Sequence, residues 1–267
     1  MNSLLTGFGS YVDDLRPAQP FNPTRCSNLG SCAKQNALKL EGADEQSKTT
    51  DQDSAKQWMF EIAHFQHEKL GQYFKEKGWL VKTEQAVDLP EPWTGRFDYL
   101  LKINHRYIVI DLKTMHPNGL HYLKGPKDHH VLQVGSYHIG LHEAYQPLDA
   151  AIIYADRGGQ NLPVSFMVKP DHEAVRADMT RIEAALQIPS KELPLMPRVQ
   201  KVDSKFDVKL IPDWRCEYCE FEGVSCGPNM SKNKVGEWIP GTGEFIPRMN
   251  KDETLYAPDF VFDKEAV

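Results

Sequence analysis

Residues 95–113, GRFDYLLKINHRYIVIDLK, form the stretch of sequence that decides the fold. Two hydrophobic segments, residues 95–103 and 106–112, lie on either side of a short polar turn, which predicts two adjacent strands in a hairpin. The second segment holds an uninterrupted apolar, largely β-branched run, which is typical of a buried strand. Asp98 lies in the first segment, and Asp111 lies at the end of the second, two residues before Lys113.

The three charged residues of this hairpin share one face. Asp111 and Lys113 are two residues apart, so their side chains project to the same side of a strand, and Asp98 joins them from the neighbouring strand. Carboxylates suit a divalent cation, and phosphate suits both that cation and lysine. The pattern therefore favours a metal-assisted site for phosphate chemistry. A surface hairpin with a solvated ion pair is the alternative, and the hairpin alone leaves both open.

The segments around the hairpin predict an α/β fold with a mixed central sheet flanked by helices. A strand pair followed by a crossover helix and another strand is the arrangement that supports this prediction. The expected elements, in chain order, are a helix from Ser31, a loop at 41–53, a helix at 54–78, a strand at 79–88, the hairpin, a loop at 114–128, a helix at 129–145, a strand at 149–155, a short strand (VSFMV) within 156–170, a helix at 171–188 and a long connection at 189–213.

Composition and charge narrow the class of protein. The chain has 267 residues, 40% of them hydrophobic and 25% charged, as in ordinary globular proteins. We find no apolar run long enough to span a membrane and no secretory signal, so we expect a cytoplasmic protein without a membrane partner. The net charge of −6 means that a nucleic acid would have to be held by a local basic groove.

The five cysteines are placed as metal ligands are. Three of them form a C-x2-C-x6-C cluster, Cys216, Cys219 and Cys226, and two stand near the start of the chain. A tetrahedral site needs a fourth ligand, which Cys26 or Cys32 can supply. On chemistry alone, four thiolates suit zinc and an iron–sulfur cluster about equally.

The order of elements and charged residues resembles the PD-(D/E)XK nuclease superfamily and its restriction-endonuclease-like core. The motif is carried by Asp98 and by Asp111-x-Lys113. Within that superfamily, Gln133-x3-Tyr137 on the predicted helix 129–145 resembles the signature of RecB-like nucleases. A further motif of this group, G-x3-H-E, is matched by residues 63–68 with alanine in place of glycine, which favours His67 over His64 as a ligand.

The cysteines resemble those of the iron–sulfur branch of RecB-like nucleases, which includes CRISPR-associated single-strand exonucleases, the AddB nuclease domain and phage relatives. That branch carries one cysteine before the nuclease core and three after it, and Cys32 fits the first place better than Cys26. The resemblance implies a [4Fe-4S] cluster on Cys32, Cys216, Cys219 and Cys226 that joins the N- and C-terminal segments, with Zn²⁺ as the alternative. It divides the chain into an N-terminal arm (1–28), a nuclease domain (29–226) and an irregular C-terminal extension (227–267).

The resemblance also implies roles for the hairpin residues. His67, Asp98, Asp111 and the backbone carbonyl of Leu112 would bind Mg²⁺ or Mn²⁺, and a histidine ligand makes Mn²⁺ a good partner. Such a metal polarises a phosphodiester oxygen and lowers the pKa of a bound water. Lys113 would orient the attacking water and stabilise charge on the phosphorus.

Four further residues are candidates for contacts with the nucleic acid. Gln133 and Tyr137 would position the strand backbone, with the ring of Tyr137 stacking on a base. Lys124 and Lys127, in the predicted loop 114–128, are candidate phosphate contacts, and a solvated loop is equally compatible with them.

The expected function is that of a metal-dependent DNA nuclease, an exonuclease on single-stranded DNA with 5′→3′ polarity by resemblance and with room for endonuclease activity. It would act in recombination, repair or phage DNA metabolism, in a bacterial or phage-infected cell. The alternative is a catalytically silent DNA-binding subunit of a recombination or CRISPR-adaptation complex. The sequence leaves open the polarity, the number of catalytic metals, iron–sulfur against zinc, the oligomeric state and any recombination-complex partner.

Overall fold

The computed structural model describes residues 20–43 and 50–193, and shorter segments up to residue 240: 199–203, 208–212, 214–217, 219–221, 224–226, 230–232 and 238–240. The chain divides into two compact units. Unit 1 consists of residues 1–30 and 48–183, and unit 2 of residues 31–47 and 184–267. Residues 29–226, expected to form one nuclease domain, therefore contribute to both units. Most of the expected arm and of the C-terminal extension lies outside the described residues.

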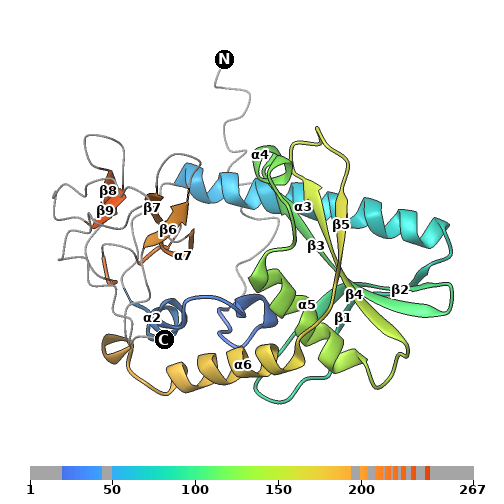
Figure 1. Ribbon diagram of the computed structural model, residues 1–267, viewed down its shortest axis with the longest axis horizontal. Helices are drawn as coiled ribbons and strands as arrows, with labels where there is room; N and C mark the ends of the chain where they lie inside the picture. Colours follow the sequence, from blue (N-terminus) through green and yellow to red (C-terminus); the bar gives the residue numbers. More distant parts are fainter. Residues whose placement is uncertain are drawn as a thin grey trace. The chain divides into compact units, whose positions relative to one another are not determined.

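Unit 1 is built on a mixed five-stranded sheet, which confirms the predicted α/β class (Figure 1). The strand order is β1-β2-β3-β4-β5; β3 and β4 are parallel and the other neighbours are antiparallel. The bounds are β1 (Leu80–Ala86), β2 (Arg96–Ile103), β3 (Arg106–Met115), β4 (Leu148–Asp156) and β5 (Val164–Val168).

Helices α3 (Thr50–Glu76) and α5 (Asp128–Leu141) pack against this sheet. The helix α6 (His172–Leu186) follows β5 and runs through the boundary between the units, and the short helix η2 (Cys26–Asn28) precedes the sheet. No helix among the described residues is both long enough and apolar enough to cross a membrane.

Two loop predictions were wrong in part. Helix α3 begins at Thr50, inside the predicted loop 41–53, because its first turn needs no apolar residue. The predicted loop 114–128 contains α4 (Pro117–His121). Proline suits the first helical position, and the imidazole of His116 accepts a hydrogen bond from Asn118 N at 3.2 Å, so the sequence encodes this short helix through its cap.

Different helices and side chains pack on the two faces of the sheet. Phe74 of α3 packs in one hydrophobic cluster with Tyr99, Ile110 and Leu112. Alternate residues of a strand face opposite ways, so Asp111 and Lys113 lie on the other face, where α5 packs. Both faces are therefore covered, which explains why β3 is buried from Val109 through Leu112.

Unit 2 contains more regular structure than its sequence predicts. Its elements are α2 (Ala33–Glu41), η3 (Ser190–Glu192), β6 (Val199–Asp203), β7 (Val208–Pro212), α7 (Trp214–Glu217), β8 (Met230–Lys232) and β9 (Trp238–Pro240). Antiparallel pairing joins β6 to β7 and β8 to β9. The predicted connection at 189–213 and the irregular reading of 227–267 were therefore wrong for these strands. Prolines interrupt the sequence around these strands, so the alternation of apolar and polar residues is too short to be recognised.

Gly140, in α5, gives a test of the packing in unit 1. A Cβ at this position would lie 2.6 Å from the carbonyl oxygen of Asp88, a backbone atom that cannot turn aside. We expect Gly140→Ala to lower the free energy of unfolding by about 1–3 kcal/mol, even though alanine favours a helix by about 1 kcal/mol over glycine. Urea denaturation measures the change. Gly125→Ala is the control, because a Cβ there meets nothing within 4 Å; equal effects of the two substitutions would contradict the prediction.

Candidate active site

The centre of the candidate site is a pair of carboxylates on adjacent strands. Tyr99 pairs with Ile110, so the antiparallel register places Asp98 opposite Asp111 on the same face of the sheet. Asp98 Oδ2 accepts a hydrogen bond from Leu112 N at 2.6 Å. Lys113 Nζ lies 3.0 Å from Asp111 Oδ2 in an ion pair. The hairpin thus brings together both acids and the lysine that the sequence singles out.

Both carboxyl groups are held in an unfavourable environment for charge. Burial, followed by the neighbouring Asp111, raises the pKa of Asp98 to about 8. Burial also raises the pKa of Asp111, which is 2% exposed, against the opposing effect of Lys113. Two carboxylates side by side, one buried and the other 19% exposed, favour a shared proton or a bound cation over two free negative charges.

A chain of hydrogen bonds connects the lysine to α5. Lys113 Nζ donates to Gln133 Oε1 at 2.7 Å, and Gln133 Nε2 donates to the hydroxyl of Tyr137 at 2.6 Å. Burial, then the charge of Asp111, raises the pKa of Tyr137. The ring of Tyr137 is only 3% exposed, so the expected stacking on a base does not agree with the structure. Gln133 and Tyr137 instead hold the ammonium group of Lys113 in place.

His67 approaches the carboxylates from α3. Its Nδ1 lies 3.7 Å from Asp98 Oδ1, whereas His64 pairs with Glu68 at 3.2 Å on the same helix. The hydroxyl of Tyr99 donates to the carbonyl oxygen of His67 at 2.6 Å and fixes this part of the helix. Burial lowers the pKa of His67, so the neutral ring, the form that binds metals, is favoured.

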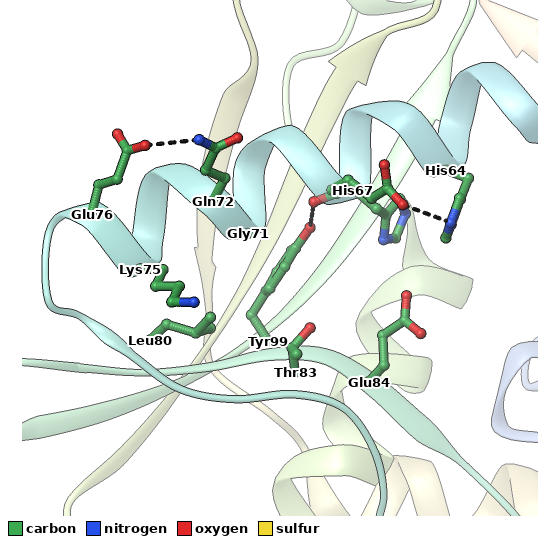
Figure 2. Close-up of a pocket in the computed structure, with 11 residues that line it drawn as sticks. His64, His67, Gly71, Gln72, Lys75, Glu76, Leu80, Thr83, Glu84 and Tyr99 are labelled. Carbon is green, nitrogen blue, oxygen red and sulfur yellow. Dashed lines mark hydrogen bonds and ion pairs between the residues drawn. The ribbon is translucent and has the colours of Figure 1, made fainter.

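A pocket of about 870 Å³ opens beside His67, between α3 and strands β1 and β2. Figure 2 shows Glu84 rising from β1 on the side of the pocket where His67 and His64 lie. Glu84 lies between the pairs Thr83–Tyr99 and Gln85–Phe97, and therefore opposite Asp98. Its backbone is left-handed, with a φ of 47°, which few residues other than glycine adopt.

Glu84, His130 and Tyr154 are residues of this region that the sequence reading missed. Burial, then Lys113, lowers the pKa of His130 to about 2, and its Nδ1 lies 2.8 Å from the hydroxyl of Tyr154. That hydroxyl also accepts a hydrogen bond from Lys127 N at 2.9 Å. No local pattern marks His130 or Tyr154, and the position of Glu84 depends on a shift of register in β1.

Lys124 and Lys127 stand where the sequence placed them, in the segment between α4 and α5. Both are exposed, and Lys127 is the N-cap residue of α5. Lys127 and Lys113 both lower the pKa of His130 through their charge, so both lie near this imidazole of α5.

The residues around Asp98 have the chemistry of a metal site. Within the described part of the chain, no three histidine, cysteine, aspartate or glutamate side chains are gathered closely enough to hold a metal ion as they stand. Asp111 Oδ2 is nevertheless buried, and among the described residues its one partner is the ion-paired ammonium group of Lys113. Two carboxylates, the imidazole of His67 and the backbone carbonyl of Leu112, which is a hydrogen-bond partner of that imidazole, form an oxygen-rich donor set that fits Mg²⁺ or Mn²⁺.

The four cysteines predicted to bind a metal or cluster all belong to unit 2. Cys32 is the N-cap residue of α2, Cys216 lies in α7, and Cys219 N donates to the carbonyl oxygen of Cys216 at 3.1 Å. Burial raises the pKa of the Cys219 thiol to about 11, and the nearby Glu220, Cys226 and Cys32 contribute to the rise. Within the described part of the chain, none of the four cysteines is in a disulfide bond.

Cys26 has a different environment. It belongs to unit 1, is 1% exposed, and its thiol hydrogen-bonds with Ser136. Gly95 leaves room for it, since a Cβ there would come within 2.8 Å of the sulfur. Cys26 is therefore a packed core residue of unit 1.

Comparison with known proteins gives a family. The model of the PD-(D/E)XK nuclease superfamily matches residues 21–226. No curated protein matches the chain significantly. Among solved structures, the crystal structure of SSO0001 is similar with a TM-score of 0.51 at 16% identity, over 84% of this chain and 96% of that one. This likeness concerns the fold.

Two further structures belong to an alkaline exonuclease, LHK-Exo from Laribacter hongkongensis. The first has a TM-score of 0.39 at 14% identity, and its complex with dAMP has a TM-score of 0.40 at 17% identity. Each covers 69% of this chain and 89% of that one.

The paired carboxylates predict an unusual dependence of stability on pH. The pKa of Asp98 rises from 3.8 to about 8 on folding, so its ionisation costs stability as the pH increases through that interval. In chelator at pH 8–9, Asp98→Asn should therefore unfold at a higher temperature than the wild type, by roughly 2–4 °C for each kcal/mol recovered. Below pH 4 the gain should vanish, and Mn²⁺ should stabilise only the wild type.

Thermal unfolding followed by circular dichroism measures both effects. Glu143→Gln removes an exposed carboxyl and serves as the control. An Asp98→Asn variant that is less stable than the wild type throughout pH 4–9 would show that the two carboxylates do not repel each other.

Proposed function

Since the chain belongs to the PD-(D/E)XK nuclease superfamily, we propose that it is a metal-dependent DNA nuclease. The observation that carries the proposal is the arrangement of Asp98, Asp111 and Lys113 on one face of the hairpin, where Gln133 holds the lysine. Acidic oxygens beside a fixed ammonium group suit the hydrolysis of a phosphodiester, which needs both a cation and a donor for the developing charge.

The metal would be held by His67, Asp98, Asp111 and the carbonyl of Leu112. When bound, it supplies Lewis-acid polarisation of the phosphodiester and a more acidic water. Occupation by a dication would also relieve the repulsion between the two carboxylates, which supports a function for their costly burial.

Lys113 would act on the charge that develops at the phosphorus and on the attacking water. Its ammonium group is shared between Asp111 and Gln133, so its position is fixed before a substrate arrives. Gln133 and Tyr137 are positioning residues in this scheme, because each acts through the next hydrogen bond. The exposed Lys124 and Lys127 are the proposed contacts to the phosphates of the strand.

The proposed substrate is single-stranded DNA, degraded from an end with 5′→3′ polarity. The resemblance to RecB-like nucleases of the iron–sulfur branch supports this choice. The pocket beside His67, of about 870 Å³, has the size of a ligand site and gives a terminal nucleotide room next to the metal. Recombination, repair or phage DNA metabolism in the cytoplasm is the proposed setting.

We assign a [4Fe-4S] cluster to Cys32, Cys216, Cys219 and Cys226 as the second cofactor, with Zn²⁺ as the alternative. The contribution of Cys32 and Cys226 to the raised pKa of the Cys219 thiol supports this grouping. The residue after Cys219 is tied to α2, since Glu220 accepts a hydrogen bond from Gln35 at 2.8 Å and pairs with Lys39. These contacts link α2, which begins after Cys32, to the segment that follows Cys219.

Replacing Lys113 with alanine tests the nuclease. We expect the variant to lose at least about a hundredfold in cleavage rate, because a preorganised charge is removed. The assay follows single-stranded DNA labelled at its 5′ or 3′ end, with Mn²⁺, Mg²⁺ or chelator. Lys102→Ala, on an exposed lysine of the same hairpin, is the matched control and should cleave normally.

Each outcome of this assay has a meaning. Metal-dependent shortening by the wild type and by Lys102→Ala supports the proposal, and the label lost first gives the polarity. Full turnover by Lys113→Ala would show that Lys113 has no role in the reaction. If even the wild type leaves the strand intact but binds it, a silent DNA-binding subunit becomes the better description.

The cysteine assignment is tested by metal content after purification without air. The wild type should be brown and carry about four iron atoms per chain, and Cys32→Ser should lose most of them. Cys26→Ser should retain the iron, because Cys26 is packed against Ser136 in unit 1. A colourless protein with one zinc would favour the alternative, and a protein with neither metal would overturn both.

A further inference from the structure

Three imidazoles cluster away from the carboxylates, where α5 ends and α6 begins. His138 and His142 are four residues apart at the end of α5, and His172 is the first residue of α6. The ring centroids are 5.0 Å apart for His138 and His172, 5.6 Å for His142 and His172, and 6.2 Å for His138 and His142. All three side chains are half-buried, so an ion from solvent can reach them.

The packing of the two helices explains why the rings meet. Gly135 lies one turn before His138, and a Cβ there would come within 2.9 Å of Val175 Cγ2. The absence of a side chain at Gly135 thus lets the start of α6 lie against α5. Val175, one turn after His172, is 1% exposed. The close approach of Gly135 and Val175 places His172 beside His138.

Hydrogen bonds to backbone carbonyls fix the tautomers of two of the rings. His138 Nε2 lies 3.1 Å from the carbonyl oxygen of Leu148, and His142 Nδ1 lies 2.9 Å from that of Ile139. A carbonyl only accepts, so these nitrogens carry the protons. The lone pairs are then on Nδ1 of His138 and Nε2 of His142. Such bonds are the usual support of metal-binding histidines.

His172 closes the cluster from the other helix. Its Nε2 lies 2.9 Å from His138 Nδ1 and, because that nitrogen has the lone pair, His172 is the donor. A dication between the two rings would replace this hydrogen bond, and the proton of His172 would move to its other ring nitrogen. Binding would therefore need a change of tautomer, with no net loss of a proton.

We propose that His138, His142 and His172 form a site for a transition-metal dication such as Zn²⁺. In a tetrahedral site with nitrogens about 2.0–2.1 Å from zinc, two nitrogens lie about 3.3 Å apart and two ring centroids about 5.2 Å apart. The observed centroid distances, 5.0, 5.6 and 6.2 Å, are within about 1 Å of that value. The rings do not converge as they stand, so His142 must turn inward and the His138–His172 contact must open slightly.

The proposed site is chemically and spatially separate from the carboxylates. Leu148, which anchors His138, pairs with Tyr107, four residues before Asp111 along β3. Imidazoles prefer zinc, nickel or copper, whereas Mg²⁺ prefers oxygen ligands. Asp171 and Arg176 lie near His172 with opposite charges that offset each other. A metal here would clamp the end of the helix that carries Gln133 to the start of α6.

The test compares zinc binding in variants of the full chain by calorimetry. All proteins carry Asp98→Asn and Asp111→Asn, which removes the carboxylate site. The cysteines are unchanged in every protein, so any zinc that they bind is the same in each. Adding His142→Gln or His172→Gln should remove one zinc equivalent or weaken its binding by at least about tenfold. His105→Asn, at an exposed position in the turn of the hairpin, is the matched control and should bind as the parent does.

Unchanged zinc stoichiometry and affinity in both variants would overturn the proposal, and so would equal losses in His105→Asn. Circular dichroism without zinc shows whether each variant is folded. If a variant is unfolded, a zinc-edge anomalous map of the wild-type crystal decides the matter. A peak among the three rings supports the site, and peaks confined to carboxylates or cysteines overturn it.

Discussion

The structure of unit 1 depends on one electrostatic constraint, the placement of Asp98 opposite Asp111 on adjacent buried strands. Two carboxylates in this position disfavour the folded state unless their surroundings compensate. The N–H of Leu112 and the ammonium of Lys113 provide the compensation, and Gln133 holds that ammonium in place. Since these groups come from β3 and α5, the contact between strand and helix is also what maintains the site.

The fold around this pair was predictable because its signals are local. The apolar run of β3, the turn before it and the helical period of residues 54–78 each predict an element without reference to the rest of the chain. The position of Glu84 opposite Asp98 was not predictable, because it depends on a shift of register between Leu80 and Lys82 in β1. The burial of Tyr137 depends on Gly95, which is distant in sequence.

The choice of the fourth cysteine also depends on contacts that are distant in sequence. Spacing grouped Cys216, Cys219 and Cys226, but could not choose between Cys26 and Cys32 as a neighbour, because that choice depends on tertiary contacts. In the fold, Cys26 packs beside Ser136 in unit 1, while Cys32 begins α2 in unit 2. The short strands of unit 2 were missed because runs of three to five residues between prolines carry too little pattern.

The chain passes between the two units more than once, and this has a consequence for the order in which they can form during synthesis. Residues 31–47 emerge from the ribosome before the sheet of unit 1, yet they belong with residues 184–267, which emerge after it. The side chains that α2 contacts, Leu193 and Glu220 among them, are synthesised only after the last strand of that sheet. The five strands of the sheet of unit 1 are complete by residue 168, so the hairpin carboxylates can assemble before the residues that α2 contacts have been synthesised.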